Sequence, residues 1–418
     1  MGETGRRERT MTDAAPPTPP EGSADPDRAR ALLTVWFTLF LDLVAFGVII
    51  PVLPFYAESF GAAAWQVTLL STVFSLSQFV MSPILGRLSD RYGRRRIMLL
   101  SIAGSSLSML ILGLAGALWV VFLARLVNGA CSANISTAHA YVADRTAPAE
   151  RAKYMGMMGA AIGIGFIVGP ILGGLLAIDT MPELPFLVAA GLSAVDFLMA
   201  LVWLPESRPP NARKAPTQAQ RPARRFLALF DSDLRGTQIG ALALVAFGFF
   251  TAFANMESSF ALFTEATYGW GARETGFFFT YVGVVITVMQ GAVVGRVVDG
   301  LGERRTLLLG LALMAAGFLA QGALHWLAAL LVGGGLVAAG NGLMNPSLNA
   351  LVSRASSADD QGLNMGIIQS ASSLGRITGP AMAGPLFEFL APGAPLVFGG
   401  CLMLVVVALA TRKVEAAS

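Results

Sequence analysis

Three charged side chains stand deep inside strongly apolar stretches of this sequence. Asp42 lies about ten residues into the stretch 31–55, Arg125 about six residues into 119–142, and Glu257 well inside 237–263. If these stretches cross a lipid bilayer, a charge at that depth costs about 2.5–3.5 kcal/mol, so it should face a cavity or a charged partner. We therefore expect these three residues to be the proton-coupling groups of the protein.

Depth in the bilayer should bring Asp42 and Arg125 together. With a rise of about 1.5 Å per residue and a hydrocarbon core of roughly 30 Å, the two side chains lie within about 6 Å of each other in depth. A carboxyl group between a guanidinium and an apolar wall can load a proton and release it as a cavity opens to either side. The alternative for this pair is a buried ion pair that only fixes two helices. The alternative for Glu257 is a satisfied polar contact inside the protein.

The composition that surrounds these residues is typical of a membrane protein. Of 418 residues, 55% are apolar and 13% charged, whereas soluble domains average about 25% charged residues. Apolar segments long enough to cross the bilayer, which takes about 20 helical residues, run over 31–55, 67–85, 97–116, 119–142, 154–178, 185–204, 237–263, 275–294, 306–324, 326–350, 361–389 and 393–411. The sequence therefore predicts 12 transmembrane helices and no other regular structure.

The basic residues are sorted to one side of these predicted spans. When both termini are placed in the cytoplasm, nearly all of the 29 Lys and Arg residues fall in cytoplasmic tails and loops, and Arg273 falls in an outward loop. This bias predicts a multi-pass protein of the cell membrane, the inner one where there are two, with both termini cytoplasmic. The net charge of +3 is thus a consequence of topology, and we expect no nucleic-acid partner.

A charged turn occurs twice at half-chain spacing. Residues 86–96 read GRLSDRYGRRR and residues 295–305 read GRVVDGLGERR, so that Asp90 and Asp299 lie 209 positions apart. Such a period indicates an internal duplication into two six-helix bundles, related by an axis along the membrane normal. The predicted organisation is a disordered cytoplasmic tail 1–30, an N-terminal bundle 31–204, a Pro- and Arg-rich cytoplasmic linker 205–235 and a C-terminal bundle 236–412.

The duplication also helps to distinguish residues needed for the fold from residues needed for function. The positions 209 residues beyond Asp42 and Arg125 are Thr251 and Gly334. A need that was purely architectural should appear in both halves, so the asymmetry of these two charges favours a functional role.

Several motifs resemble those of a known family. The segments LDLVAFGVIIPVLP at 41–54, ARLVNG at 124–129 and GFIVGPILGG at 165–174, together with the repeated turn, resemble the major facilitator superfamily and, within it, the tetracycline-efflux-like group of drug:proton antiporters. The resemblance covers roughly residues 31–412. It implies the major facilitator fold, and it implies that an acid in the first helix and the Arg of the fourth helix couple transport to protons. Gln66 departs from the pattern, because tetracycline pumps carry His there.

The resemblance further implies that the repeated turn is a cytoplasmic gate. Glycines permit tight turns, and an Asp can cap a helix or pair with a nearby Arg. The alternative is a turn that only anchors the protein at the anionic inner leaflet. The expected gate residues are Gly86, Asp90, Arg91, Gly93, Arg94, Asp299, Gly302 and Arg304.

A stripe of small residues follows in the fifth predicted span. Small residues spaced four apart allow two helices to approach closely, and a proline allows a bend. By resemblance this is the helix 5 antiporter motif, which sets that helix against the other half; ordinary helix packing is the alternative. The motif residues are Gly165, Gly169, Pro170, Gly173 and Gly174.

Uncharged polar side chains within the spans suggest a substrate cavity. An apolar cavity with a few hydrogen-bonding groups suits a small amphipathic molecule. The expected cavity residues are Gln78, Asn134, His139, Asn255, Gln290, Asn345 and Gln369. Asp196 is close enough to a helix end to reach the cytoplasmic surface, and Arg376 could pair with an acid or a helix terminus.

These observations predict a monomeric, proton-coupled antiporter that exports small amphipathic drugs or metabolites by alternating access, as tetracycline and multidrug efflux proteins do. A proton-coupled symporter for uptake and a non-transporting or lipid-handling membrane protein are the alternatives. The chain has no P-loop and no visible nucleophile–base–acid set, and Cys131 and Cys401 are too sparse for a metal site. We therefore expect no enzymatic activity, no cofactor and no bound metal.

Overall fold

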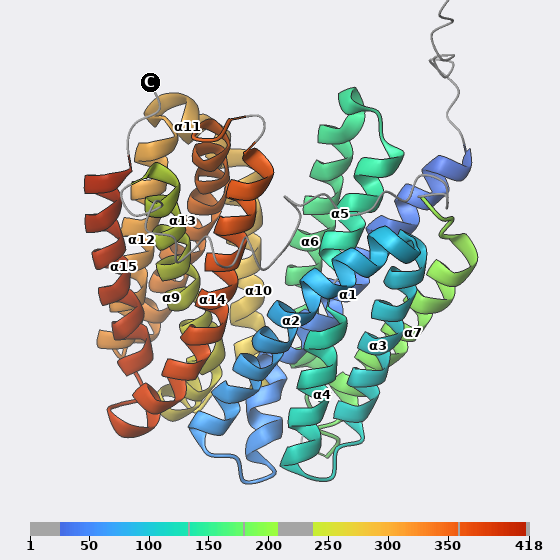
Figure 1. The fold of residues 1–418 in the computed structure, drawn as a ribbon. Coiled ribbons are helices and arrows are strands. Elements are labelled where there is room, and N and C mark those ends of the chain that lie inside the picture. The colour runs from blue at the N-terminus through green and yellow to red at the C-terminus, as the bar shows by residue number, and fades with distance from the viewer. Residues whose placement is uncertain (1–25, 133, 179, 208–236, 358–359, 415–418) are drawn as a thin grey trace, which may run out of the picture.

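The fold is an assembly of long helices (Figure 1). The computed structural model describes residues 26–132, 134–178, 180–207, 237–357 and 360–414. The helices of the N half are α1 (Pro26–Glu58), α2 (Ala64–Tyr92), α3 (Arg94–Gly113), α4 (Leu118–Cys131), α5 (Asn134–Arg145), α6 (Pro148–Leu176) and α7 (Leu184–Trp203). Those of the C half are α9 (Gln238–Tyr268), α10 (Ala272–Val288), the π-helical turn η4 (Met289–Val293), α11 (Val294–Leu301), α12 (Glu303–Ala323), α13 (Leu327–Arg354), α14 (Gln361–Phe389) and α15 (Ala394–Lys413). Figure 1 shows the N half on the right and the C half on the left.

In the described residues, 11 helical stretches are long and apolar enough to cross a membrane. The expected span 119–142 corresponds to one of these stretches, Leu118–Arg145, within which α4 ends at Cys131 and α5 begins at Asn134. The expected span 361–389 is the continuous 29-residue helix α14, which contains Pro380 and Pro385 and is not among the 11 stretches. The count of 12 transmembrane helices therefore stays a prediction.

The first helix begins earlier than expected. It starts at Pro26, inside the predicted tail 1–30. Proline suits the first turn of a helix, and from there the helix runs through one charged turn into the apolar segment. Arg28 in this turn forms an ion pair with Glu150 of α6. The rest of the tail and nearly all of the linker 205–235 lie outside the described residues.

Both copies of the repeated turn are built around a glycine with positive φ. Gly93 joins α2 to α3 with φ of 106°, and Gly302 joins α11 to α12 with φ of 76°. Residues other than glycine rarely adopt these backbone angles, so glycine lets the chain reverse direction at a single residue in each turn. We call the end of the molecule where α2 meets α3 the basic end.

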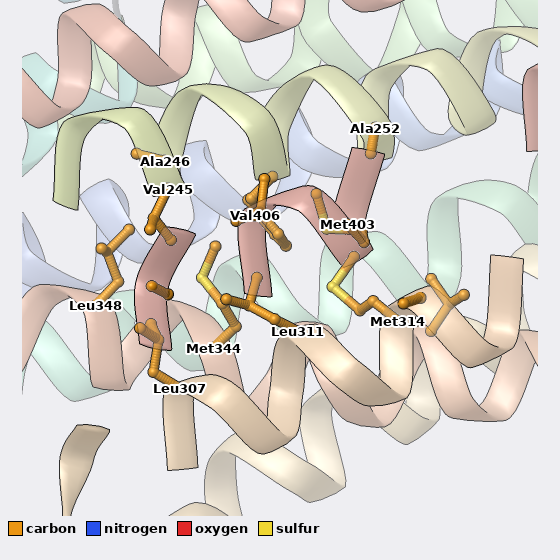
Figure 2. Close-up of a cluster of buried hydrophobic side chains, with 14 of the residues drawn as sticks. Val245, Ala246, Ala252, Leu307, Leu311, Met314, Met344, Leu348, Met403 and Val406 are labelled. Atoms are coloured by element: carbon orange, nitrogen blue, oxygen red, sulfur yellow. The ribbon is translucent and has the colours of Figure 1, made fainter. Parts of the chain in front are cut away.

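Each half is held together by closely packed apolar and small residues. Figure 2 shows this core in the C half, where Leu311 and Met314 of α12 lie against Met403 and Val406 of α15. Lipid tails are as apolar as these side chains, so close packing rather than water exclusion holds such helices together. Large apolar side chains on the outer surface, such as Trp119 and Trp326, are left exposed, as a bilayer-embedded protein requires.

The two halves meet at the end opposite the basic end. The backbone N–H of Trp65, at the start of α2, donates to Glu388 Oε2 near the end of α14 at 3.2 Å. Gly174 of α6 packs so closely on α10 that an added β-carbon would stand 3.1 Å from the carbonyl oxygen of Ala272. Nearer the middle, Thr280 Oγ1 donates to the Ile167 carbonyl at 3.3 Å. We call this side the closed end.

Candidate functional site

A large cavity lies between the two halves. Its volume is about 1280 Å³, and its wall is formed by α1 to α6 from the N half and by α9, α10, η4, α13 and α14 from the C half. It extends from Leu53 and Val67, near the closed end, to Arg87 and Asp90 at the basic end. A space of this size, mostly apolar with a few polar groups, can hold an amphipathic molecule of drug size.

Glu257 lies in this cavity between two arginines that come from different halves. It projects from α9 and is within electrostatic range of Arg125 in α4 and of Arg376 in α14. The predicted partner of Arg125 was Asp42, and the structure instead gives it Glu257. The difference arises because depth along the membrane normal says nothing about which helices face each other across the cavity.

Both arginines are positioned by aromatic rings. The guanidinium of Arg125 lies 4.4 Å from the ring centroid of Phe74, and that of Arg376 lies 5.0 Å from the ring of Phe250. Such cation–π contacts hold a desolvated cation without neutralising it. The Arg125 side chain is 4% exposed, and its Nε and Nη1 have no hydrogen-bond partner among the described residues. These donors are therefore available to a molecule that enters the cavity.

Asp42 occupies a separate part of the cavity wall. Its Oδ1 accepts a hydrogen bond from Asn134 Nδ2 of α5 at 3.3 Å. Besides Asp90 at the basic end, the cavity wall thus carries an acid from each half with different partners: Asp42 has an amide, and Glu257 has two guanidinium groups.

Five of the seven expected polar cavity residues line the cavity: Gln78, His139, Gln290, Asn345 and Gln369. Asn134 and Asn255 do not. Asn134 is 1% exposed and is turned to Asp42, while Asn255 is fully buried and donates to the Gly379 carbonyl at 3.2 Å. In both cases the amide satisfies another buried polar group instead of facing the open space.

Other lining residues were not predicted as cavity residues. Arg376 joins the cavity beside Glu257, and Arg87 lines it at the basic end. Several lining residues of α2 are serines on one helical face, at the spacings that bring side chains onto the same side: Ser71, Ser75 and Ser82, in register with Gln78. This polar stripe in an otherwise apolar span was the signal that could have identified them.

The predicted gate residues make contacts within each half, and the two copies differ. In the first copy, Arg94 forms ion pairs with Asp90 at 2.8 Å and with Asp144 at 3.3 Å. In the second copy, Arg304 donates to the carbonyls of Val414 at 2.6 Å and Thr411 at 2.8 Å.

The remaining gate residues have various places. Gly86 and Asp90 line the cavity, whereas Arg91 and Asp299 are exposed. Gly93 and Gly302 form the turns themselves.

The helix 5 motif, which lies in α6, packs mainly against α1 of its own half. A β-carbon on Gly169 would stand 2.7 Å from the Gly47 Cα, and Gly165 and Gly173 meet α1 in the same way. Only the far side of the motif meets the other half, where Gly174 faces α10 and the Pro170 carbonyl lies against Gly276. The expectation that the whole motif faces the other half is therefore wrong for its three α1-facing glycines.

Asp196 does not reach the surface as expected. Its side chain in α7 is 2% exposed, and Oδ1 accepts a hydrogen bond from Thr38 Oγ1 of α1 at 2.8 Å. The expected reach to the cytoplasmic surface fails because this face of α7 packs against α1 and α3. Asp196 is not part of the cavity wall.

Comparison with known proteins agrees with this architecture. The family model described as Major Facilitator Superfamily matches residues 35–298 and 242–417. The class D tetracycline resistance protein of Salmonella ordonez is 31% identical over 366 residues, which cover 86% of this chain and 89% of the relative. Multidrug resistance protein 2 of Bacillus subtilis (strain 168) is 32% identical over 374 residues, covering 88% and 91%.

A solved structure, the human organic anion transporter MFSD10 (TETRAN), superposes with a TM-score of 0.69 at 27% identity and covers 92% of this chain and 100% of that one. These relatives are transporters and not enzymes. The chain is accordingly a multi-pass membrane protein with a small-molecule substrate. It belongs to the Major Facilitator Superfamily, within its tetracycline-efflux-like group.

Proposed function

We propose that the protein is a proton-coupled antiporter that exports small amphipathic molecules by alternating access. The observation that carries this proposal is the position of Glu257 in a cavity between the halves, within range of Arg125 from one half and Arg376 from the other. A titratable group at that place links the charge of the cavity to the arrangement of the two halves.

Protonation of Glu257 changes both the charge of the cavity and the attraction between the two halves. When ionised, Glu257 attracts Arg125 across the cavity and can bind an amino group of a substrate. When protonated, it does neither, so the proton and a positively charged substrate group compete for the same carboxyl group. Competition for one site is what an antiporter requires, because the two ligands then cross the membrane in alternate steps. Asp42 provides a second carboxyl group on the same wall.

The proton gradient supplies enough free energy for useful export. One charge moving through 100 mV releases about 2.3 kcal/mol, and a tenfold concentration gradient costs about 1.4 kcal/mol. One proton per cycle therefore supports roughly fortyfold accumulation of a neutral solute before any pH gradient is added.

The orientation follows from the basic residues. Because Lys and Arg are retained on the cytoplasmic side, the basic end is the cytoplasmic end and the structure is open towards the cytoplasm. Substrate enters there, while contacts such as Trp65 with Glu388 close the outer end. One chain supplies both halves of the cavity wall, so a monomer is sufficient for the cycle.

Drug susceptibility of an efflux-deficient bacterial host tests this function. Cells that produce the protein are compared with cells that produce Asp42→Asn, on a panel that contains tetracycline, ethidium and an amphipathic carboxylate. We expect the wild-type protein to raise resistance to at least one compound and Asp42→Asn to abolish the gain at an equal membrane level. Increased cellular accumulation of a panel compound, driven by an inward proton gradient, would instead favour the uptake symporter.

The carboxylate is included for a specific reason. Three arginines, Arg87, Arg125 and Arg376, line the cavity, and one structural relative is the human organic anion transporter MFSD10 (TETRAN). An anionic amphipathic substrate is therefore the second candidate class.

A further inference from the structure

Among the described residues of the N half, Asp196 is a buried acid that the cavity mechanism does not use. It lies about eight residues from the end of α7 and is enclosed by α1 and α3. A permanently ionised carboxylate without a cation partner would be costly at that place. The hydrogen bond that it accepts from the uncharged hydroxyl group of Thr38 offsets only part of that cost.

Asp196 is linked to Asp42 through a single turn of α1. Thr38, the hydrogen-bond donor to Asp196, lies four residues before Asp42 and therefore on the same face of the helix. The two carboxyl groups are within electrostatic range of each other. Asp42 is on the cavity wall and Asp196 is behind it, so the pair connects the cavity with the interior of the N half.

No described cation neutralises this pair. Arg125 interacts with Glu257, and Arg95 of α3 donates to the Leu201 carbonyl at the basic end of α7. The other described charged residues on the helices that pack against α7 lie near helix ends: Glu58 ends α1 at the closed end, and near the basic end are Arg28, Arg30, Arg94, Arg96, Glu150, Arg151 and Lys153. Two carboxylates close together in an apolar medium cannot both be ionised at low cost, so such a pair retains one proton between them.

A layer of unsatisfied polar atoms continues from the pair into the N half. α3 and α7 run antiparallel, with Arg95 bonded to Leu201 and Ser106 Oγ donating to the Ala190 carbonyl at 3.1 Å. Ser101 and Asp196 each stand midway between these two contacts, and so they lie at one level.

Ser101 Oγ is buried and has no hydrogen-bond partner among the described residues, and the same is true of Asn134 Oδ1 and Thr137 Oγ1 in α5. Buried polar atoms of this kind normally hold ordered water. Asn134 also bonds Asp42 through its amide nitrogen. Atoms able to hold water for a proton path between the two acids are therefore present in α3 and α5.

We propose that Asp196 is a second proton-carrying residue, which exchanges one shared proton with Asp42 through this polar layer. In each exchange an O–H bond breaks at one carboxyl group and forms at the other, so the pair keeps a single negative charge. While the shared proton is on Asp196, Asp42 can bind a second proton from the cavity and return it, so the pair alternates between one and two protons. The role in transport rests on the proposed antiport, whereas the shared proton does not.

Infrared spectroscopy of the full chain in lipid tests the shared proton without any substrate. The C=O stretching band of protonated carboxyl groups is titrated in the wild-type protein, Asp42→Asn, Asp196→Asn and the control Glu274→Gln, an exposed helix-capping residue of α10. We expect an Asp196 band, identified by its loss in Asp196→Asn. Its midpoint should move by about one pH unit or more towards acid in Asp42→Asn, because the neighbouring negative charge is gone.

Absence of the Asp196 band at every pH, or a midpoint that Asp42→Asn leaves in place, would overturn the proposal. If Asp196→Asn does not fold, Asp196→Glu assigns the band by its changed frequency. The Asp42→Asn variant retains Asp196, so it reports the midpoint of the Asp196 band even if Asp196→Asn does not fold.

Transport separates a proton-carrying role from a structural one. The amide oxygen of Asp196→Asn can still accept the Thr38 hydrogen bond but cannot titrate. We expect this variant to shift the pH profile of transport, and Asp196→Glu to restore the profile. A wild-type pH profile in Asp196→Asn would reduce Asp196 to a link between α1 and α7. If no compound is transported by the wild-type protein, the proposed function fails, and the infrared result still decides the shared proton.

Discussion

At the scale of single residues, the acids Glu257 and Asp42 on the cavity wall have different surroundings. Glu257 lies among guanidinium groups, whereas Asp42 has Asn134 and the neighbouring Asp196. The charges and polar groups around a carboxyl group set the pH at which it takes up a proton, and they decide whether a bound substrate changes that pH. The two acids therefore have separable effects on transport.

Arg125 is expected to be needed for its geometry as well as its charge. In Arg125→Lys the cation remains, but the planar group that lies over Phe74 is lost, and a compact ammonium cannot keep the same distance to Glu257. We predict that the rate of proton-coupled transport falls by about tenfold or more, equivalent to roughly 1.4 kcal/mol. Initial transport rates in proteoliposomes measure this effect. Full activity in Arg125→Lys would mean that a positive charge alone is sufficient.

At the scale of helices, the contact between α1 and α6 depends on the absence of side chains. In Gly169→Ala the new methyl group would stand 2.7 Å from the Gly47 Cα, so the helices must separate. We predict destabilisation of about 1–3 kcal/mol, visible as a lower Tm of the purified protein. The matched control is Gly159→Ala in the same helix, where no atom lies within 4 Å of the added carbon. Equal Tm values in the two variants would contradict the close packing of α1 and α6.

The two copies of the repeated turn are expected to respond differently to the same change. Arg94 contacts Asp90, Asp144 and Ser89 through different nitrogens, and a lysine cannot replace all three. We predict that Arg94→Lys reduces transport by on the order of tenfold, whereas Arg304→Lys, whose partners are the carbonyls of α15, has a smaller effect. Transport rates normalised to the amount of protein in the membrane give the comparison. A larger loss in Arg304→Lys would show that the gate lies in the second copy.

Much of the helical architecture could be predicted from the sequence, because bilayer thickness dictates long apolar segments and the half-chain period exposes the repeat. The end of α4 at Cys131 could not, since the whole segment 119–142 is apolar enough to span. The sequence also does not show which helices lie side by side in the membrane plane. Depth matched Arg125 with Asp42, but the helices bring it to Glu257. Asn134 and Asn255 show the same limit, because only the fold decides whether a polar side chain faces a cavity or another buried group.

At the scale of the whole molecule, transport requires that the closed end opens during each cycle. Trp65 of α2 lies beside Glu388 of α14 there, with the Trp65 backbone N–H donating to Glu388 Oε2 at 3.2 Å. In a chain whose Cys131 and Cys401 are replaced by alanine, we predict that a reducible bifunctional thiol reagent joins Trp65→Cys to Glu388→Cys and abolishes transport, and that reduction restores it. The single-cysteine variants treated with the same reagent are the controls. Transport that persists in the fully cross-linked protein would exclude opening at this end.

Coupling of proton movement to substrate movement is tested by comparing the wild-type protein with Glu257→Gln. Both are reconstituted in proteoliposomes that contain a pH-sensitive dye, and a compound to which the wild-type protein confers resistance is added on the cytoplasmic side. We predict proton movement opposite to the substrate in the wild-type protein and none in Glu257→Gln, whose amide cannot take up or release a proton. Substrate-driven proton movement of wild-type size in Glu257→Gln would contradict this prediction.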